Sequence, residues 1–515
     1  MKVFQKRTLS LLLAVLMLVS MVSVAGLASA QSASALSGTI TISLPMELSK
    51  PVWDALAADY MARNPGVTVV VDNKETTTYA EWLGTQLAGG DMTADIVINN
   101  TAIAYFAQGK FADYSLYLNR PNPYMGGEPW MNGLEPEAYA INVFNGIFTI
   151  CTDSTQVVWF YNKDIFAKAG VEPPTTWDEL VDVCKKIKDA GYTPFSIAGD
   201  ANSINAHLGW LQWIYVDQYF RDMEPLALVK DGDYNYDPDL MTAWTFDPTD
   251  RYNDSATKVA FNSIRVLRMI LDGEVGPDTA KYKDMFQNFK KIIPEYVEEG
   301  FFGTDFLTAQ NIFLQGKAAI LLNTTSFAGS FDKLMEAASA TETFDLGFFK
   351  SPPMTGDLVG VDYTREIGGQ VGFVGVINKD KAQNDLNMDF MMYYLSPDGQ
   401  AVRYQAMLDN GLAPEGTSLV KNAVMPDKWR ELFAALKYDG AHPASNPFYV
   451  FSSGLDAEST RAFQDYSQQY FQGTITMDEF ASLYQAALVA SVPRYLTMMG
   501  MNATATDDPS KSPLP

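Results

Sequence analysis

The segment Gln156–Asp200 most constrains the fold, because it predicts a strand, an amphipathic helix and a second strand in direct succession. Its apolar run Val157–Tyr161 has the β-branched and aromatic composition of a strand buried on both faces. Thr176 as N-cap, with Glu179 completing a capping box, marks the start of the helix, and Phe195–Ala198 is predicted to be the next strand. The apolar face of the helix consists of residues at helical spacing: Leu180, Val183, Cys184 and Ile187.

A similar alternation of strands and helices precedes this segment. Short apolar strands are predicted at Thr39–Leu44, Val67–Val71 and Asp95–Ile98, with amphipathic helices between them. This order indicates parallel strands with helices on both faces. Ligands of such sheets bind beyond the carboxyl ends of the strands, so Glu47, Asn99 and Asn100 are candidate ligand-binding residues.

Several ordered motifs resemble those of one protein family. YNKDIFAKAGVEPPTTWDEL and IKDAGYTPFSIAGD lie within 156–200, and NPGVTV, LAGGDMTADIVINN and AQGKFADY lie before it. GKAA at 316–319 and MMYYLSPDGQ at 391–400 follow in the same order. Together they resemble the extracellular solute-binding proteins of carbohydrate ABC transporters, the group typified by maltodextrin-binding protein.

This resemblance implies an α/β, two-lobed periplasmic-binding-protein fold of type II, each lobe a doubly wound, mainly parallel sheet flanked by helices, joined by a hinge. We expect lobe 1 from 38–150 plus about 372–420, and lobe 2 from 156–370 plus about 425–500. Residues 502–515 are polar and end in proline, which predicts a disordered tail. The implied function is binding of a sugar or oligosaccharide between the lobes and its delivery to the permease subunits of an ABC transporter by hinge closure. The expected partners are that saccharide and that permease, for a protein that is itself a monomer.

Aromatic and polar residues after predicted second-lobe strands are further candidates, because sugars present apolar ring faces and many hydroxyl groups. Each has an ordinary alternative in core packing or helix capping. Gly368 and Gly369 lie in a glycine-rich strand that matches the family's second crossover between lobes, where a hinge or ordinary bulges both fit. The other candidates are Asp200, Asn205, His207, Trp210, Trp213, Ser326 and Phe327. Phe327 stands where the family commonly has tryptophan, which leaves a smaller stacking surface.

The N-terminus predicts export. A basic start precedes a largely apolar run, and Ala28-Ser29-Ala30 forms an A-x-A cleavage signal, so residues 1–30 are expected to be a signal peptide. An uncleaved anchor is the alternative, since the uncharged run is long. No cysteine lies near the cleavage signal, so the protein is expected to be periplasmic or extracellular and not an evident lipoprotein.

Charge and composition exclude several functions. The formal net charge of −24 repels phosphate backbones and makes nucleic acid an improbable partner. Two cysteines and two histidines are too few for a zinc site or thiol chemistry, and we expect no metal and no cofactor. Asp231–Asp237 resembles a calcium loop but lacks Gly at the sixth position and Glu at the twelfth, so residues 221–260 are interpreted as a surface insertion. Spacing leaves open whether Cys151 and Cys184 form a disulfide.

An enzyme is the main alternative to a binding protein. A glycosidase needs two carboxylates at a set separation, and none of the 61 Asp and Glu residues is marked by a catalytic motif. We therefore expect no enzyme. The alternatives are a secreted polysaccharide-degrading enzyme and a binding protein that presents its ligand to a sensor.

Overall fold

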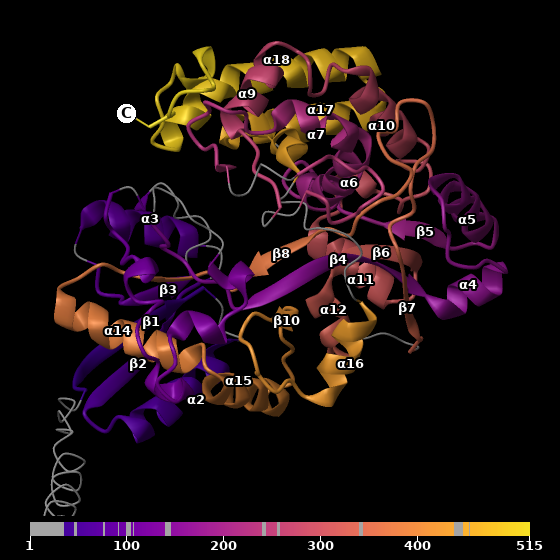
Figure 1. Ribbon diagram of the computed structural model, residues 1–515. Helices are drawn as coiled ribbons and strands as arrows, with labels where there is room; N and C mark the ends of the chain where they lie inside the picture. The colour runs from indigo at the N-terminus through magenta and orange to yellow at the C-terminus, as the bar shows by residue number, and fades with distance from the viewer. Residues whose placement is uncertain are drawn as a thin grey trace, which may run out of the picture.

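The computed structural model describes residues 36–514 except 46–48, 76–77, 91, 99–104, 107, 140–145, 239–243, 255–257, 339–342, 437–445 and 453. Within these residues the elements form two sheets, each with its own helices and hydrophobic core (Figure 1). We call the part built on the first sheet lobe 1 and the part built on the second sheet lobe 2. The leader predicted at 1–30 lies outside the described residues.

Lobe 1 contains a four-stranded sheet in the order β2 (Val67–Asn73), β1 (Gly38–Leu44), β3 (Ile96–Ile98), β9 (Val374–Val376). The first three strands pair in parallel and β9 pairs antiparallel to β3. Ile40, Ile42 and Leu44 alternate inward along β1 and are buried, as their period-two spacing predicts. The expected β-α-β-α-β order is confirmed, with α2 (Lys50–Arg63) and α3 (Tyr79–Gly89) between the strands and α14 (Lys381–Tyr394) and α15 (Pro397–Asp409) added later in the chain.

Lobe 2 contains a six-stranded sheet centred on the ten-residue strand β4 (Asp153–Asn162). Only β5 (Thr193–Ser196) and β6 (Ala318–Thr324) pair in parallel. The prediction of a mainly parallel sheet is therefore wrong for this lobe, although the α/β class holds. The reason is that β4 pairs antiparallel with each of its described partners, which are β6, β7 (Leu346–Phe349), β8 (Gly368–Val371) and β10 (Thr417–Ser418).

The two halves of β4 pair with different strands. The last residues, Val157–Asn162, pair with β6 and β7, whereas the first, Asp153–Gln156, pair with β8 and β10. Figure 1 shows β4 and β8 running between the two groups of elements. The chain passes between the lobes three times here, at the start of β4, from β8 to β9, and through β10.

The helices of lobe 2 cover its sheet, and several of them, including the two nearest the C-terminus, form the layer at the top of Figure 1. Helix α5 begins after Thr176, whose Oγ1 accepts a hydrogen bond from Glu179 N, as predicted. The return bond differs by one residue, because Glu179 Oε2 accepts from Thr175 N and Oγ1. The helices are α4 (Lys163–Ala169), α5 (Trp177–Asp189), α6 (Ile204–Phe220), α7 (Glu224–Ala227), α9 (Ser263–Leu271), α10 (Ala280–Lys290), α11 (Phe306–Leu314), α12 (Thr325–Gly329), α13 (Phe331–Ala337), α16 (Asp427–Ala435), α17 (Ala457–Gln472) and α18 (Met477–Met498).

The interpretation of 221–260 as a surface insertion needs correction. Arg221, Glu224 and Asp254 are fully buried among charged partners. In the segment that resembles a calcium loop, both Asp233 oxygens lie 2.8 Å from Arg265 Nη2, so this carboxylate serves an ion pair. The stretch is tied into lobe 2 because its acidic residues pair with arginines distant in sequence.

The tail prediction is also wrong for the described residues 502–514. Asn262 Nδ2 donates to the Pro509 carbonyl at 2.7 Å, and Asn502 N donates to the Pro513 carbonyl at 2.7 Å. Met501 and Ala505 pack against the core of lobe 2. The polar composition suggested disorder, but these contacts anchor the segment beside α9.

The two cysteines are free and buried in different lobes. Burial raises the pKa of the Cys151 thiol to about 12 and raises that of Cys184 as well. The open question of a disulfide is thus answered by the fold, which separates the two thiols.

Candidate functional site

A hollow of about 560 Å³ lies where lobe 1 meets the crossing strands. It is bounded by the carboxyl end of β1 at Leu44 and Pro45 and the end of β3 at Ile98, which is where parallel sheets bind their ligands. Its other walls come from α2, α3, α14 and α15 and from the crossing segments. The remaining lining residues are Ser49, Val52, Trp53, Leu56, Tyr79, Ala80, Thr152, Asp153, Val371, Gly372, Phe373, Val374, Tyr394, Arg403, Met407, Leu412, Ala413 and Glu415.

Aromatic rings form one wall of this hollow. Trp53 and Tyr394 lie with ring centroids 4.8 Å apart and planes tilted by 38°. The Tyr79 hydroxyl accepts a hydrogen bond from Ile98 N at 3.1 Å, which ties α3 to the end of β3. Burial raises the pKa of the Tyr79 hydroxyl, so it stays protonated. Flat apolar surface beside neutral hydroxyl groups is suited to the faces and edges of a polyhydroxylated ligand.

Three charged residues also line the hollow. Arg403 donates from Nη1 to Asp153 Oδ1 at 2.9 Å and from Nη2 to Asp153 Oδ2, a bidentate pair. Nη1 also donates to Gln400 Oε1 at 2.9 Å. Burial opposes the charged form of Arg403, but Asp153 outweighs it and the pKa of the guanidinium is raised. The positive charge beside the hollow is therefore already paired.

Glu415 differs from this pair. It is exposed, and no hydrogen bond or ion pair of its carboxyl occurs within the part of the chain that the structure describes. Nearby protein atoms nevertheless raise the pKa of the carboxyl by desolvation, the Asp153 carboxylate adds to the rise, and Arg403 opposes it. An exposed group that is still partly desolvated lies in a concave region, open to water on one side.

Close backbone contacts surround the crossings. Gly372 has φ of +69°, and a Cβ there would lie 2.0 Å from Thr152 Oγ1. A Cβ at Gly416 would lie 2.0 Å from the Ser154 carbonyl oxygen. Both positions therefore require glycine, the first for its backbone conformation as well. Neither is one of the two glycines predicted from the sequence: Gly368 pairs with Gln156 and Gly369 with Thr155 along β4.

The structure places the predicted residues in several regions. Glu47, Asn99 and Asn100 lie outside the described residues, although Pro45 and Ile98 next to them line the hollow. Five other predicted residues lie around the start of α6, and none of them lines the hollow. Ser326 pairs with Thr324 through hydroxyl groups 2.9 Å apart. Phe327 packs in the core, with its ring centroid 5.2 Å from that of Phe160.

Five predicted residues gather at the start of α6. His207 is completely buried, its Nδ1 accepts from Ala198 N at 2.9 Å, and its ring stacks on Phe306. Burial lowers the pKa of His207 to about 3, so the ring is neutral. Trp210 and Trp213 are partly buried against the core of lobe 2. Among described atoms, Asp200 Oδ2 and Asn205 Oδ1 are buried without a hydrogen-bond partner. A role for this group in binding remains a prediction.

Sequence reasoning missed most of the lining residues. Trp53, Tyr79 and Arg403 lie in none of the quoted motifs, and Tyr394 lies in MMYYLSPDGQ, which did not mark it as a ligand-binding residue. The position of Leu44 and Ile98 at strand ends was the one usable signal, because it directs attention to the segments that follow them.

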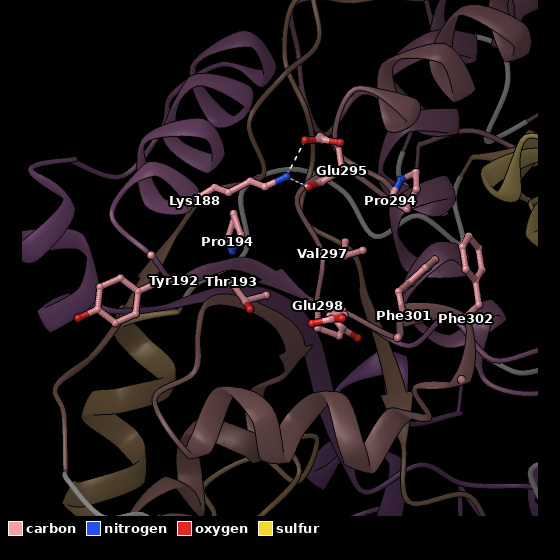
Figure 2. Close-up of a pocket in the computed structure, with 14 residues that line it drawn as sticks. Lys188, Tyr192, Thr193, Pro194, Pro294, Glu295, Val297, Glu298, Phe301 and Phe302 are labelled. Carbon is pink, nitrogen blue, oxygen red and sulfur yellow. Dashed lines mark hydrogen bonds and ion pairs between the residues drawn. The ribbon is translucent and has the colours of Figure 1, made fainter.

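Two other hollows lie away from the strand ends of lobe 1. One of about 840 Å³ lies on the edge of lobe 2 beside the amino end of β5 (Figure 2). There Lys188 Nζ donates to the Glu295 carbonyl at 2.9 Å and to Oε1 at 2.6 Å. The other, of about 800 Å³, lies between β10 and α16. Among the described residues no group of three or more His, Cys, Asp or Glu is arranged to hold a metal ion.

Comparison with known proteins identifies the family. A family model described as bacterial extracellular solute-binding protein matches residues 47–401. The part of the chain that the structure describes contains no helix long and apolar enough to span a bilayer.

Similar proteins agree with this match. A probable sugar-binding periplasmic protein of Rhizobium meliloti (strain 1021) is 39% identical over 82 residues, 15% of this chain and 20% of that protein. An sn-glycerol-3-phosphate-binding periplasmic protein of Brucella abortus (strain 2308) is 34% identical over 70 residues, 13% and 14% of the two chains. These alignments span far less than two thirds of either relative.

A solved structure of a chitin oligosaccharide binding protein has a TM-score of 0.60 at 16% identity, covering 88% of this chain and 99% of that one, which shows a common fold. The family match covers more than half of the chain, and its members are substrate-binding proteins. The chain therefore belongs to the bacterial extracellular solute-binding proteins and not to an enzyme family.

Proposed function

We propose that this protein binds a sugar or oligosaccharide in the hollow between lobe 1 and the crossing strands and delivers it to the permease subunits of an ABC transporter by hinge closure. The protein acts after export, in the periplasm or outside the cell, as a monomer. The observation that carries the proposal is the position of the hollow, which joins the strand ends of a parallel sheet to all three crossings between the lobes.

The lining of the hollow supports a saccharide ligand. Trp53 and Tyr394 line the hollow with their aromatic rings and are 7% and 4% exposed in this arrangement, and Glu415 offers carboxyl oxygens at the open side. Sugars use both, because their ring faces are apolar and their edges carry hydroxyl groups. The relative named as a probable sugar-binding protein agrees with this ligand class.

Hinge closure is supported by where the lining residues come from. Asp153 belongs to β4 of the lobe 2 sheet, whereas Trp53 and Tyr394 belong to lobe 1 helices. A ligand that contacts both sets stabilises the arrangement in which they are close, and this differential affinity is what shifts a two-state equilibrium. The residues at the start of α6 are proposed to reach the ligand only in the closed form.

Thermal unfolding with maltotriose, raffinose, xylotriose and chitotriose tests the proposal. A saccharide present at a hundred times its dissociation constant stabilises the folded protein by about 2.7 kcal/mol. Recovery of the intact sugar by chromatography separates binding from hydrolysis. A cleaved sugar, or no shift with any saccharide, contradicts the proposal.

A matched pair of variants locates the site. Trp53→Leu keeps apolar volume but removes the flat ring, and we expect at least a tenfold loss of sugar affinity by calorimetry. Trp244→Leu removes a partly buried tryptophan of lobe 2 that does not line the hollow, and its affinity should be unchanged. If both variants bind the sugar with the same affinity, the sugar does not bind in this hollow. A decrease in the radius of gyration on binding, measured by X-ray scattering, tests closure.

A further inference from the structure

The charges around the hollow do not balance. Arg403 is the one basic residue that lines it among the described residues, and its guanidinium is held by Asp153 and Gln400. Glu415 is the second acid of the lining and has no partner among described groups. The wall therefore carries one unpaired negative charge.

Two segments that are adjacent in sequence to the lining residues Pro45 and Ile98 lie outside the described residues, and neither contains a basic residue that could offset this negative charge. Residues 46–48 are Met-Glu-Leu and residues 99–104 are Asn-Asn-Thr-Ala-Ile-Ala, so neither contains Lys, Arg or His. Among the described residues that line the hollow there is thus no unpaired cation for an anionic ligand.

The backbone holds Glu415 at this place. The Thr325 hydroxyl donates to the Glu415 carbonyl at 2.7 Å and lies 2.9 Å from the Thr155 hydroxyl. Next in sequence, Gly416 packs against the Ser154 carbonyl so closely that no side chain fits. Contacts from β4 and α12 therefore fix the backbone of Glu415 at this crossing, where its carboxyl is close enough to Asp153 to feel that charge.

We propose that Glu415 determines the charge selectivity of the site, accepting hydrogen bonds from the hydroxyl groups of an uncharged saccharide and excluding phosphorylated and carboxylated solutes. This inference rests on the proposed function. An ionised carboxyl accepts hydrogen bonds from two neighbouring hydroxyls at once, as a sugar edge presents them. A phosphate or uronate in the same place meets a like charge in a partly desolvated site, and repulsion of this kind is how sites reject wrong ligands.

The inference separates this protein from some of its relatives. The Brucella abortus relative is named for binding sn-glycerol 3-phosphate, an anion. An unpaired arginine is a common partner of a bound phosphate, and here Arg403 is already paired with Asp153.

Calorimetry with charge-matched probes tests the inference on the mature protein. The neutral probes are maltotriose, raffinose, xylotriose and chitotriose, and the anionic probes are sn-glycerol 3-phosphate and trigalacturonate. We expect the wild type to bind a neutral probe at least a hundredfold more tightly than either anion. Glu415→Gln keeps the shape of the side chain and removes its charge. It should lower the affinity for the neutral probe about tenfold and reduce the ratio of neutral to anionic affinity at least tenfold. Glu431→Gln, an exposed acid on α16, is the control and should change neither.

Each other outcome overturns the inference. If a neutral probe binds but Glu415→Gln keeps both affinity and preference, Glu415 is not the selective residue and the proposed function stands. Anion binding by the wild type that equals or exceeds neutral binding rejects the selectivity. If no probe binds the wild type, the proposed function fails with it. Thermal unfolding of each variant confirms that it is folded, and Glu415→Lys, expected to favour the anions, gives an independent second variant.

Discussion

Two clusters of acidic residues and arginines in this protein have opposite surroundings. Beside the hollow, Asp153 and Arg403 pair while Glu415 stays open to water. In lobe 2, Arg365 binds Asp217 and Asp254 in full burial, and Arg221 and Glu224 complete the group.

The two clusters differ in the environment of the carboxyl group that has no arginine to neutralise it. Both clusters contain one more carboxyl than arginine charge can neutralise. In lobe 2 burial, reinforced by Asp254, raises the pKa of Glu224 far above its usual value, so this acid is neutral. Beside the hollow the extra acid faces solvent and can meet a ligand. A sealed cluster stabilises a fold, whereas an open one with an unpaired member is available for binding.

The largest expected effect comes from breaking the sealed cluster. Arg365→Ala leaves Asp217 buried without its cation and Asp254 with Arg221 as its one remaining arginine partner among the described residues, and the free energy of unfolding should fall by about 3–5 kcal/mol. Urea unfolding at neutral pH measures it. A loss below about 1 kcal/mol would mean that the cluster admits water and is not sealed.

A buried acid without a cation sharpens the comparison. Burial raises the pKa of Glu298 from 4.5 to about 7, and the residue is 6% exposed. A raised carboxyl pKa costs stability as pH increases from about 4.5 to about 7, because the folded state must then give up a proton that it holds tightly. Glu298→Gln should remove this cost, at most about 3 kcal/mol above pH 7.

Unfolding of the wild type and Glu298→Gln across pH 4–8 checks this prediction. Ile197 N, which donates to Glu298 Oε2 at 3.4 Å, keeps an acceptor in the variant. The difference in stability between the two proteins should grow in favour of the variant as pH rises. A constant difference would contradict a raised pKa.

Asp153→Asn should change the open cluster from net negative to neutral at a smaller cost in stability. The amide still accepts from Arg403, so we expect a loss of about 1–3 kcal/mol. Because the guanidinium charge is then no longer neutralised, sn-glycerol 3-phosphate should bind more tightly than to the wild type in calorimetry. Unchanged anion affinity would show that Arg403 cannot be reached from the hollow.

The smallest effect is expected at the hollow of Figure 2, where the Lys188–Glu295 pair is exposed on both sides. Glu295→Gln should change the free energy of unfolding by less than about 1 kcal/mol and leave sugar affinity unchanged. Thermal unfolding and calorimetry measure both. A clear loss of affinity would move the ligand site from lobe 1 to this edge of lobe 2.

Much of the local structure could be predicted from the sequence. Thr176 caps its helix and Leu180, Val183 and Cys184 are buried, as their spacing indicates. The antiparallel pairing of β4 could not be predicted, because its apolar run suits a central strand of either kind. The anchoring of residues 502–514 could not be predicted either, because it depends on a hydrogen bond from Asn262, which is distant in sequence.

The candidate site divides in the same way. Strand ends at Leu44 and Ile98 follow from the alternation of apolar segments, and they led to the edge of the first sheet where the hollow lies. Aromatic content led instead to Phe327 and His207, which the fold buries. An aromatic residue has the same composition signal in a core as in a binding surface.

The sequence by itself determined the order of elements, the caps and apolar faces of its helices, and the family, because these depend on neighbours within a few residues or on motifs in a fixed order. Only the tertiary structure decided which charges are neutralised. Asp153 and Arg403 are 250 residues apart, and only the passage of the chain through β10 and α15 brings Glu415 to them unpaired. Electrostatic pairing acts over a few ångströms in space, so no local pattern reveals which carboxyl remains free to meet a ligand.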